Sequence, residues 1–248
     1  MYKRQAEAGV RFSPGPQSMI TITKKSRSAI QYLQSTEGKI LSYLKKVIGS
    51  KDFNYRTFGT AIEEHLTDAI VKVLTEGGFI KSGSDFVVSP NKNYFPDFEL
   101  KTTPSLAIEF KSGNKSQYRN GKWVTVNNSE NDMGTINEWS RKIEKFGGDN
   151  IYYIFVIYNF NDTTKEVLSV QVAPFYQFIG LNSGKFLKYR EKDGNLRPKN
   201  FGIESPIKTL KQFEELLSKT IVYRSKRIIK RHRLIIKNAA KVLKKELD

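Results

Sequence analysis

Hydrophobic residues recur along this chain with two different periods, one typical of helices and one typical of strands. Residues 58–74 carry apolar side chains at every third or fourth position, which predicts a helix with one buried face. Residues 106–112 alternate between apolar and polar side chains, which predicts a strand with two different faces. Residues 151–160 are almost continuously apolar and aromatic, which is typical of a strand buried on both faces.

Turn-forming residues between these stretches mark the remaining elements of the central region. Residues 28–48 have helical spacing with a break near 35–38, so we expect two helices that end at Gly49. From residue 58 onward the pattern predicts helix, strand, strand, strand, helix, strand. These six elements are expected at residues 58–74, 84–89, 97–101, 106–112, 135–146 and 151–160.

The ends of the chain add further elements to this core. After a strand at 167–172 we expect a basic hairpin at 185–197 around Asp193-Gly194, a helix at 205–217 and a long basic helix at 220–247. We find no repeat and no low-complexity linker, so residues 19–248 are expected to form one domain. Its core spans about residues 56–160, and its basic helical addition spans about 205–248. Residues 1–18 are polar and are read as a disordered arm, or as an extension upstream of a start at Met19.

Three charged residues of the two central strands suggest chemistry. Asp97 begins one strand, and Glu109 and Lys111 lie on the same face of the next, which a turn at 102–105 connects to the first. Two carboxylates that converge at a sheet edge can hold a hard divalent cation through oxygen. The lysine can orient or help to deprotonate an attacking water, or offset charge that builds on a phosphate.

The spacing of these residues resembles a known nuclease signature. Pro96-Asp97, eleven intervening residues and then Glu109-Phe110-Lys111 is similar to the motif of the PD-(D/E)XK nuclease superfamily. The resemblance covers about residues 56–160 and implies an α/β (α+β) fold. Its αβββαβ core would have a mixed central sheet, here with N- and C-terminal helices added. It also implies that Asp97 and Glu109 bind Mg²⁺ and that Lys111 is the catalytic lysine.

A second set of residues competes with this assignment. Glu99-Leu100-Lys101 is also Glu-x-Lys, and Asp85 would have to be its upstream acid. It resembles the Glu-Leu-Lys-Thr found in some mismatch-repair nucleases. We prefer Glu109 because its strand is more apolar and directly follows Pro-Asp.

The resemblance also suggests a further acid and a DNA-facing segment. Gly59 and Glu63 match a loose Gly-x-x-x-Glu pattern on the helix ahead of the motif, where Glu63 would support the metal or Lys111; a solvated helix glutamate is the alternative. The segment after the catalytic strand offers amides and basic groups that can read base edges, and the C-terminal arginines can contact phosphates. The predicted DNA-binding residues are Ser112, Asn114, Lys115, Gln117, Arg119, Asn127, Asn128, Arg224, Arg227, Arg231 and Arg233.

Charge and composition agree with a nucleic-acid partner. The chain of 248 residues has a net charge of +17 and a pI of about 9.8, and residues 151–248 contribute +11 of that charge. It has no cysteine, which excludes disulfides and thiolate zinc sites, and its two histidines, His65 and His232, are expected on helix surfaces. No membrane-spanning run and no phosphate-binding glycine loop is present in the sequence, so neither a membrane nor a nucleotide cofactor is expected.

The resemblance implies a Type II restriction endonuclease that cleaves double-stranded DNA. It would act as a homodimer in a prokaryotic cytoplasm and depend on Mg²⁺, with Mn²⁺ able to substitute and Ca²⁺ supporting binding only. Two alternatives stay open at this point. One is a DNA-repair or junction-resolving nuclease of the same superfamily, and the other is a basic nucleic-acid-binding protein without catalytic activity.

Overall fold

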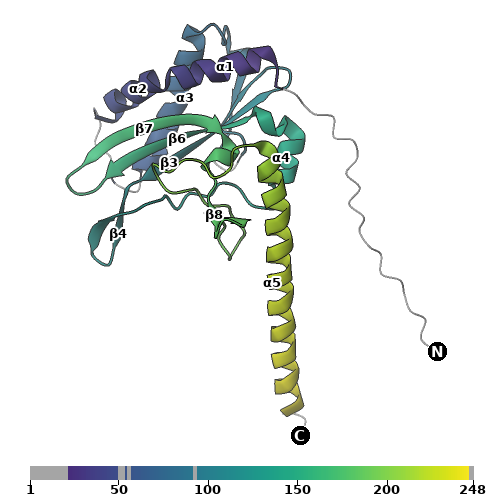
Figure 1. Cartoon of the computed structure of the whole chain (residues 1–248). Helices are drawn as coiled ribbons and strands as arrows, with labels where there is room; N and C mark the ends of the chain where they lie inside the picture. The colour runs from purple at the N-terminus through teal and green to yellow at the C-terminus, as the bar shows by residue number, and fades with distance from the viewer. Residues whose placement is uncertain (1–21, 50–53, 55–56, 92–93, 246–248) are drawn as a thin grey trace.

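A computed structural model of the chain has a five-stranded sheet between two layers of helices, with one long helix projecting from it (Figure 1). It describes residues 22–49, 54, 57–91 and 94–245; the arm expected at residues 1–18 lies outside them. The helices are α1 (Lys24–Ser35), α2 (Glu37–Gly49), α3 (Phe58–Glu76), α4 (Trp139–Phe146) and α5 (Leu210–Lys245). The strands are β1 (Phe86–Val88), β2 (Phe98–Leu100), β3 (Leu106–Asn114), β4 (Ser116–Arg119), β5 (Lys122–Thr125), β6 (Ile151–Phe160), β7 (Lys165–Pro174), β8 (Leu181–Asn182) and β9 (Phe186–Leu187).

Helices α1, α2 and α3 cover one face of the sheet. Their apolar stripes meet the strands in one core cluster, in which Leu33, Leu44 and Leu66 are fully buried. The predicted break between the first two helices is confirmed at Thr36, whose hydroxyl donates to the Tyr32 carbonyl at 2.7 Å and closes the end of α1. The three helices therefore hold the strands from one side as a unit.

The sheet has the order β1-β2-β3-β6-β7 and is mixed. Strands β3 and β6 are parallel, and every other neighbouring pair is antiparallel. The predicted order of helix, strand, strand, strand, helix and strand is confirmed, and β6 has the predicted bounds. Because β3 lies between two partner strands, its backbone is hydrogen-bonded on both edges, and its side chains have a fixed support.

The opposite face of the sheet is covered by α4, the start of α5 and a 3₁₀ turn at Phe175–Phe178. Trp139 is fully buried at the centre of this second cluster. Its ring stacks on Phe175 with 4.0 Å between centroids, and it meets the edge of Phe213 at 5.7 Å. Trp139 therefore anchors α4 on this face of the sheet.

Helix α4 is shorter than the sequence predicts, because it begins at Trp139 rather than at Thr135. The first two of the four residues ahead of it pair with a distant segment. Thr135 forms an isolated bridge with Asn195, and the Ile136 amide donates to the Gly194 carbonyl at 3.0 Å. A helix cannot begin while its first residues are held in this way, so tertiary pairing overrides the local periodicity.

The C-terminal region also differs from the prediction. One continuous helix, α5, replaces the two helices expected at 205–217 and 220–247, and it begins at Leu210. Ser205 instead makes a local turn with the backbone of Ile207. The expected break near Thr220 is absent because the Thr220 hydroxyl donates to the Leu216 carbonyl within the helix and accepts the Leu187 amide. Among the described residues, no helix is long and apolar enough to cross a membrane.

Two small two-stranded sheets, β4–β5 and β8–β9, lie below the main sheet in Figure 1. Strands β4 and β5 form a compact hairpin, with Asn120 and Gly121 at positive φ in its tight turn. The basic hairpin expected at 185–197 is present only in part. Residues 188–197 form the hairpin, in which the Arg190 amide donates to the Asn195 carbonyl and the Arg197 amide donates to the Lys188 carbonyl, both at 2.8 Å. Phe186 and Leu187 pair instead with β8.

Candidate active site

The two motif strands bring their charged residues to one place on the sheet. Phe98 pairs with Ile108, so Asp97, which precedes β2, lies opposite Glu109 on β3. Glu109 and Lys111 share a face of β3 with Ala107, which belongs to the core cluster beneath α4. The predicted approach of Asp97 to Glu109 follows from this register.

Asp97 is held by the neighbouring strand. Its Oδ2 accepts the Phe110 backbone amide at 2.7 Å, which fixes the carboxyl group against β3. Burial and then the nearby Glu109 carboxylate raise the pKa of Asp97 to about 7, against the opposing effects of Lys111 and of the Phe110 amide. A carboxyl group with this pKa resists ionisation until a cation approaches it.

Glu109 and Lys111 form a half-buried ion pair. The Lys111 Nζ lies 2.8 Å from Glu109 Oε1, and the Lys111 and Glu109 side chains are 19% and 13% exposed respectively. Burial alone would lower the pKa of Lys111, but Glu109, Asp97 and Glu63 outweigh it and raise that pKa. The lysine is therefore charged at neutral pH, and it neutralises only part of the acidic cluster.

The geometry leaves one carboxylate oxygen without a partner. Glu109 Oε2 is buried and accepts no hydrogen bond, which is costly for a charged atom. Together with the raised pKa of Asp97, this orphaned oxygen fits a hard divalent cation bound between the two acids. The described residues contain no group of three or more acidic or histidine side chains placed to hold a metal. Mg²⁺ fits such a two-carboxylate site because it keeps several of its waters.

Glu63 reaches the site from helix α3. Its Oε1 accepts the Ser112 hydroxyl at 3.0 Å, and burial raises its pKa against the effect of Lys111. Gly59 permits this approach, because a Cβ there would lie 3.1 Å from both Ser112 Oγ and the Tyr158 hydroxyl. Of the two interpretations of Glu63, the structure supports the one that places it beside the motif rather than in solvent.

The competing set of residues does not converge in the same way. The Asp85 carboxylate accepts the amides of Lys81 and Ser82 at 2.7 and 2.9 Å, so it caps its own 3₁₀ turn. Glu99 pairs across the sheet with Ala107 and Val87, and Lys101 is exposed. The geometry brings together Asp97, Glu109 and Lys111, and it does not bring Asp85 to Glu99.

Lys142 is a further charged residue near the site that the sequence did not reveal. It lies on α4 with its Nζ 4.1 Å from the Phe95 ring centroid and 3.9 Å from Glu138 Oε2. Burial lowers the pKa of Lys142, and the carboxylates of Glu109 and Glu138 oppose that effect. Only its position three residues after Trp139 on the same helix could have indicated that it turns inward.

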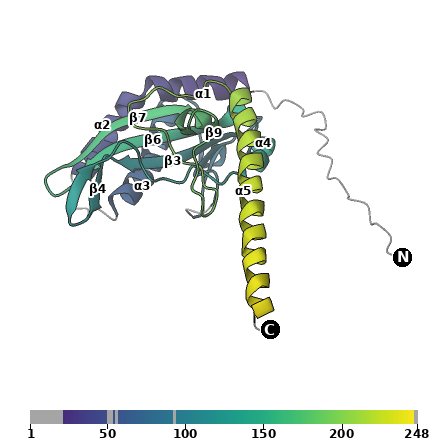
Figure 2. The ribbon, with the colours of Figure 1, turned by 60° about the horizontal axis from the view of Figure 1, so that its bottom comes forward.

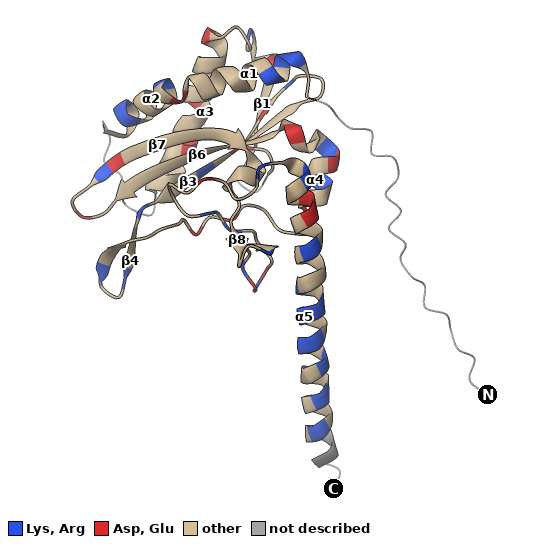
Figure 3. Cartoon of the chain, in the orientation of Figure 1, with Lys and Arg blue, Asp and Glu red and all other residues tan. Residues whose placement is uncertain are grey.

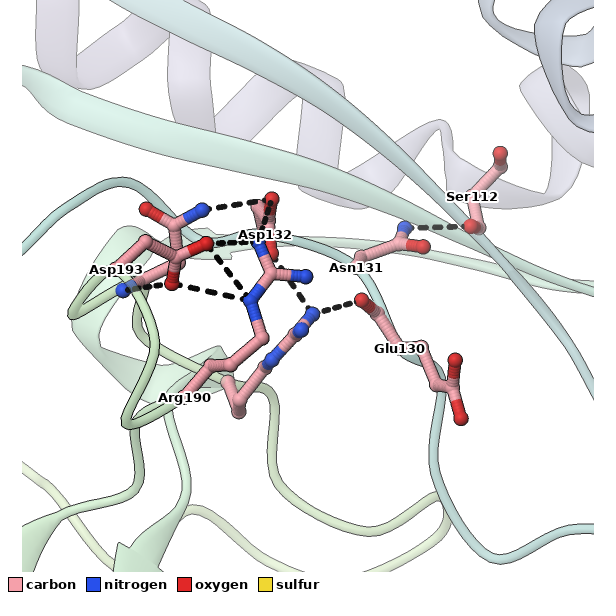
Figure 4. A network of polar contacts seen from close by, with 8 residues as sticks. Ser112, Glu130, Asn131, Asp132, Arg190 and Asp193 are labelled. Carbon is pink, nitrogen blue, oxygen red and sulfur yellow. Dashed lines mark hydrogen bonds and ion pairs between the residues drawn. The ribbon is translucent and has the colours of Figure 1, made fainter.

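The segment after β3 meets the site through a polar network (Figure 4). The Asn131 side chain donates to the Ser112 carbonyl at 2.6 Å. Next to it, Asp132 forms ion pairs with Arg190 at 3.2 Å and with Arg197 at 2.8 Å. Strand β3, the polar segment that follows it and the region of the basic hairpin are thus joined by direct contacts.

The residues predicted to face DNA fall into two groups. Gln117 and Arg119 lie on the β4–β5 hairpin, where Arg119 donates to Gln117 and pairs with Glu130 at 3.2 Å. Others are used within the protein, since the Asn114 side chain bonds both backbone groups of Phe160. The Ser112 hydroxyl donates to Glu63, and the Asn128 side chain donates to Asn200. Lys115 and Asn127 are bonded through their backbones, the Lys115 amide to the Tyr158 carbonyl and the Asn127 carbonyl to the Phe201 amide.

The C-terminal arginines line the projecting helix, along which basic residues dominate (Figure 3). Arg224 packs over the turn at Gly194, where a Cβ would lie 3.0 Å from its guanidinium carbon. Arg227 forms an ion pair with Glu191, while Arg231 and Arg233 are exposed. The arginines nearest the body are therefore docked on the basic-hairpin region, and the outer two point to solvent.

Comparisons with known proteins identify the type of fold. No protein-family model and no curated sequence matches the chain. Among solved structures, the chain is similar to the NlaIV restriction endonuclease, with a TM-score of 0.53 and 18% sequence identity over 80% of this chain and 79% of the other. The fold is therefore restriction-endonuclease-like, and the fold implied by the motif resemblance is confirmed.

Proposed function

We propose that this chain is a Mg²⁺-dependent, sequence-specific endonuclease that hydrolyses phosphodiester bonds in double-stranded DNA, like a Type II restriction enzyme. One observation carries the proposal: on a restriction-endonuclease-like fold, Asp97, Glu109 and Lys111 converge around an unpartnered carboxylate oxygen. The net charge of +17 supports a polyanionic substrate.

The residues have distinct roles in this proposal. Asp97 and Glu109 would hold Mg²⁺, which when bound lowers the pKa of a water and neutralises charge on the phosphate. Lys111 donates hydrogen bonds to the attacking water or to a phosphate oxygen, and its raised pKa keeps it protonated for that purpose. Glu63 fixes the end of the catalytic strand through the Ser112 hydroxyl.

Cleavage of both strands of a duplex requires two such sites. We therefore propose that the enzyme acts as a homodimer in which each subunit cuts one strand of a symmetric sequence. Mn²⁺ would replace Mg²⁺ because it accepts the same oxygen ligands. Ca²⁺ would support DNA binding without cleavage.

Sequencing the ends of cleaved DNA tests the proposal. A plasmid library with random inserts is incubated with the protein and Mg²⁺, and the new ends are sequenced on both strands. We expect paired ends that recur at one short sequence. Single-strand nicks would instead favour a repair enzyme, and nicks at branched DNA would favour a junction-resolving one. The absence of cleavage with both Mg²⁺ and Mn²⁺ would leave only a DNA-binding protein.

A further inference from the structure

The outer part of helix α5 has no partner within the described part of the chain that covers its apolar side chains. Every residue from 225 to 242 is exposed, and Figures 1 and 2 show the helix extending well beyond the body. Eight large apolar or aromatic residues here have 38–67% of their surface exposed. Tyr223 and Leu234 lie apart from the others, and the remaining six gather on one side: Val222, Ile228, Ile229, Ile235, Ile236 and Val242. Exposed apolar residues that gather on one side of an element mark a contact surface.

These residues follow a strict seven-residue repeat. Ile221, Ile228, Ile235 and Val242 are spaced by seven, and each of the first three is followed by a second apolar residue, Val222, Ile229 or Ile236. Ser225, His232 and Ala239 lie between the two rows on the same side of the helix. At about 100° per residue, the three rows span about 100° within each heptad, and the stripe drifts around a straight helix by about 20° per heptad. We call these residues the α5 stripe.

The α5 stripe meets the body only at its first residue, Ile221, which is partly buried against the second core cluster, and the rest of the stripe is exposed. Phe213, Leu217 and Thr220 are buried against the second core cluster or its neighbours. The same side of the helix, extended outward, carries Arg224 and Arg231. The α5 stripe is rotated from it by roughly a third of a turn, so closer packing of α5 against the body would cover arginines and leave the stripe exposed.

We propose that the α5 stripe binds the α5 stripe of a second copy of this chain. A repeat of seven residues keeps a seam in line with a partner helix, whereas a flat membrane surface or a DNA groove requires no such repeat. Burial of the six exposed residues on both helices would remove on the order of 1,000 Å² from water, which reaches the size that a specific interface requires.

The charges of α5 are arranged in a way that permits this pairing. Residues 219–245 carry eleven Lys and Arg and no Asp or Glu. Most of these cations lie on the sides of the helix away from the stripe, so two helices can meet there while their basic sides face outward. Mutual repulsion still opposes the pairing, so we expect salt to strengthen it. Two outward basic surfaces would then be available to DNA phosphates.

This inference names the contact surface of the homodimer proposed above and rests on that proposal. Sedimentation equilibrium of the full chain without DNA or metal tests it, so that its failure leaves the cleavage proposal standing. We expect a dimer whose dissociation constant falls as salt rises. Ile228→Ser with Ile235→Ser should raise that constant at least about a hundredfold. The matched pair Lys230→Ser with Lys237→Ser, on the opposite side of the helix, should leave it unchanged or lower it.

The absence of cysteine permits a second measurement. Ser225→Cys and Ala239→Cys are made as separate proteins and oxidised singly and as a mixture. Covalent dimers in the single samples support a parallel pair of stripes, and covalent dimers that form only in the mixture support an antiparallel pair. A chain that stays monomeric at all concentrations and salts overturns the proposal. Binding of such a monomer to phosphatidylglycerol vesicles would assign the stripe to a membrane surface instead.

Discussion

Asp97 is the residue whose environment best distinguishes a metal site from a structural ion pair. A structural pair would have one acid for each base, but here three acids, Asp97, Glu109 and Glu63, surround Lys111, which is bonded only to Glu109, while Lys142 lies farther out beside Glu138. The cost of this arrangement is visible in the pKa of about 7 for Asp97. Perturbed carboxyl groups of this kind cluster at functional sites, so the imbalance supports the metal site proposed above.

The raised pKa of Asp97 predicts a pH dependence of stability without metal. In the unfolded chain Asp97 has a pKa near 3.8, so between about pH 4 and pH 7 the folded state binds more protons. The free energy of unfolding contributed by this group is therefore full below about pH 4 and falls as pH rises through 7. Urea unfolding in EDTA at pH 5 and pH 8 measures the decrease, which should amount to a few kcal/mol.

Two comparisons isolate Asp97 in that experiment. Asp97→Asn cannot ionise, so its stability should fall less between pH 5 and pH 8 than that of the parent. Mg²⁺ should stabilise the parent more at pH 8 than at pH 5, because the ionised carboxylate binds it. Equal pH dependence in the parent and in Asp97→Asn would show that the pKa of this group is not raised.

At the scale of elements, we propose that the β4–β5 hairpin reads DNA bases. It follows the catalytic strand directly, and the Asn131 contact with Ser112 ties the end of the same segment back to that strand. Both ends of the segment that contains the hairpin are therefore tied to the strand that carries Glu109 and Lys111. Gln117 and Arg119 lie on the hairpin and offer an amide and a guanidinium to base edges.

Alanine substitutions test this assignment. We predict that at least one of the four changes Gln117→Ala, Arg119→Ala, Asn127→Ala and Asn128→Ala lowers discrimination between the cognate site and single mismatches by about 1–3 kcal/mol. Non-specific binding should remain, because phosphate contacts supply it. Thr125→Ala on the same hairpin is the control. If all four variants reject mismatches as the parent does, recognition lies elsewhere, and residues 185–197 become the next candidate.

Periodicity predicts those elements whose local pattern and tertiary contacts agree. The central strand β6 is apolar throughout and has its predicted bounds, and the motif located Asp97, Glu109 and Lys111. The predicted start of α4 was wrong because Thr135 pairs with Asn195, sixty residues away. No local sequence pattern encodes that bridge. Lys142 was missed for a related reason: it turns inward only because Trp139 docks α4 on the core.

At the scale of the whole molecule, the charge is concentrated where the fold projects. Basic residues dominate the projecting helix α5 (Figure 3). Helices α1 and α2 lie on the other face of the sheet, away from α5. A duplex attracted to the body would meet α5 beside the basic-hairpin region that Arg224 and Arg227 contact. Such contacts position DNA without reading its sequence.

Neutralising the arginines of α5 tests this role. Arg224→Gln, Arg227→Gln, Arg231→Gln and Arg233→Gln together should flatten the dependence of log binding constant on log salt by about one for each phosphate that the variant no longer binds. The changes at Arg231 and Arg233 should contribute most, because Arg227 already pairs with Glu191. The matched control changes Lys24, Lys25, Lys45 and Lys46 of α1 and α2 to Gln. An unchanged slope in the arginine variant would mean that α5 is only a solvated helix.

The central claim is that Asp97, Glu109 and Lys111 form a metal-dependent site for DNA cleavage. Cleavage rates of a DNA library with Mg²⁺, compared between the parent and single variants, test it most directly. We predict that Asp97→Asn, Glu109→Gln and Lys111→Met each lower the rate at least about a hundredfold. DNA binding in Ca²⁺ should survive, and Glu99→Gln and Lys101→Met should cut like the parent. Loss of cleavage in Glu99→Gln together with normal cleavage in Glu109→Gln would contradict the account.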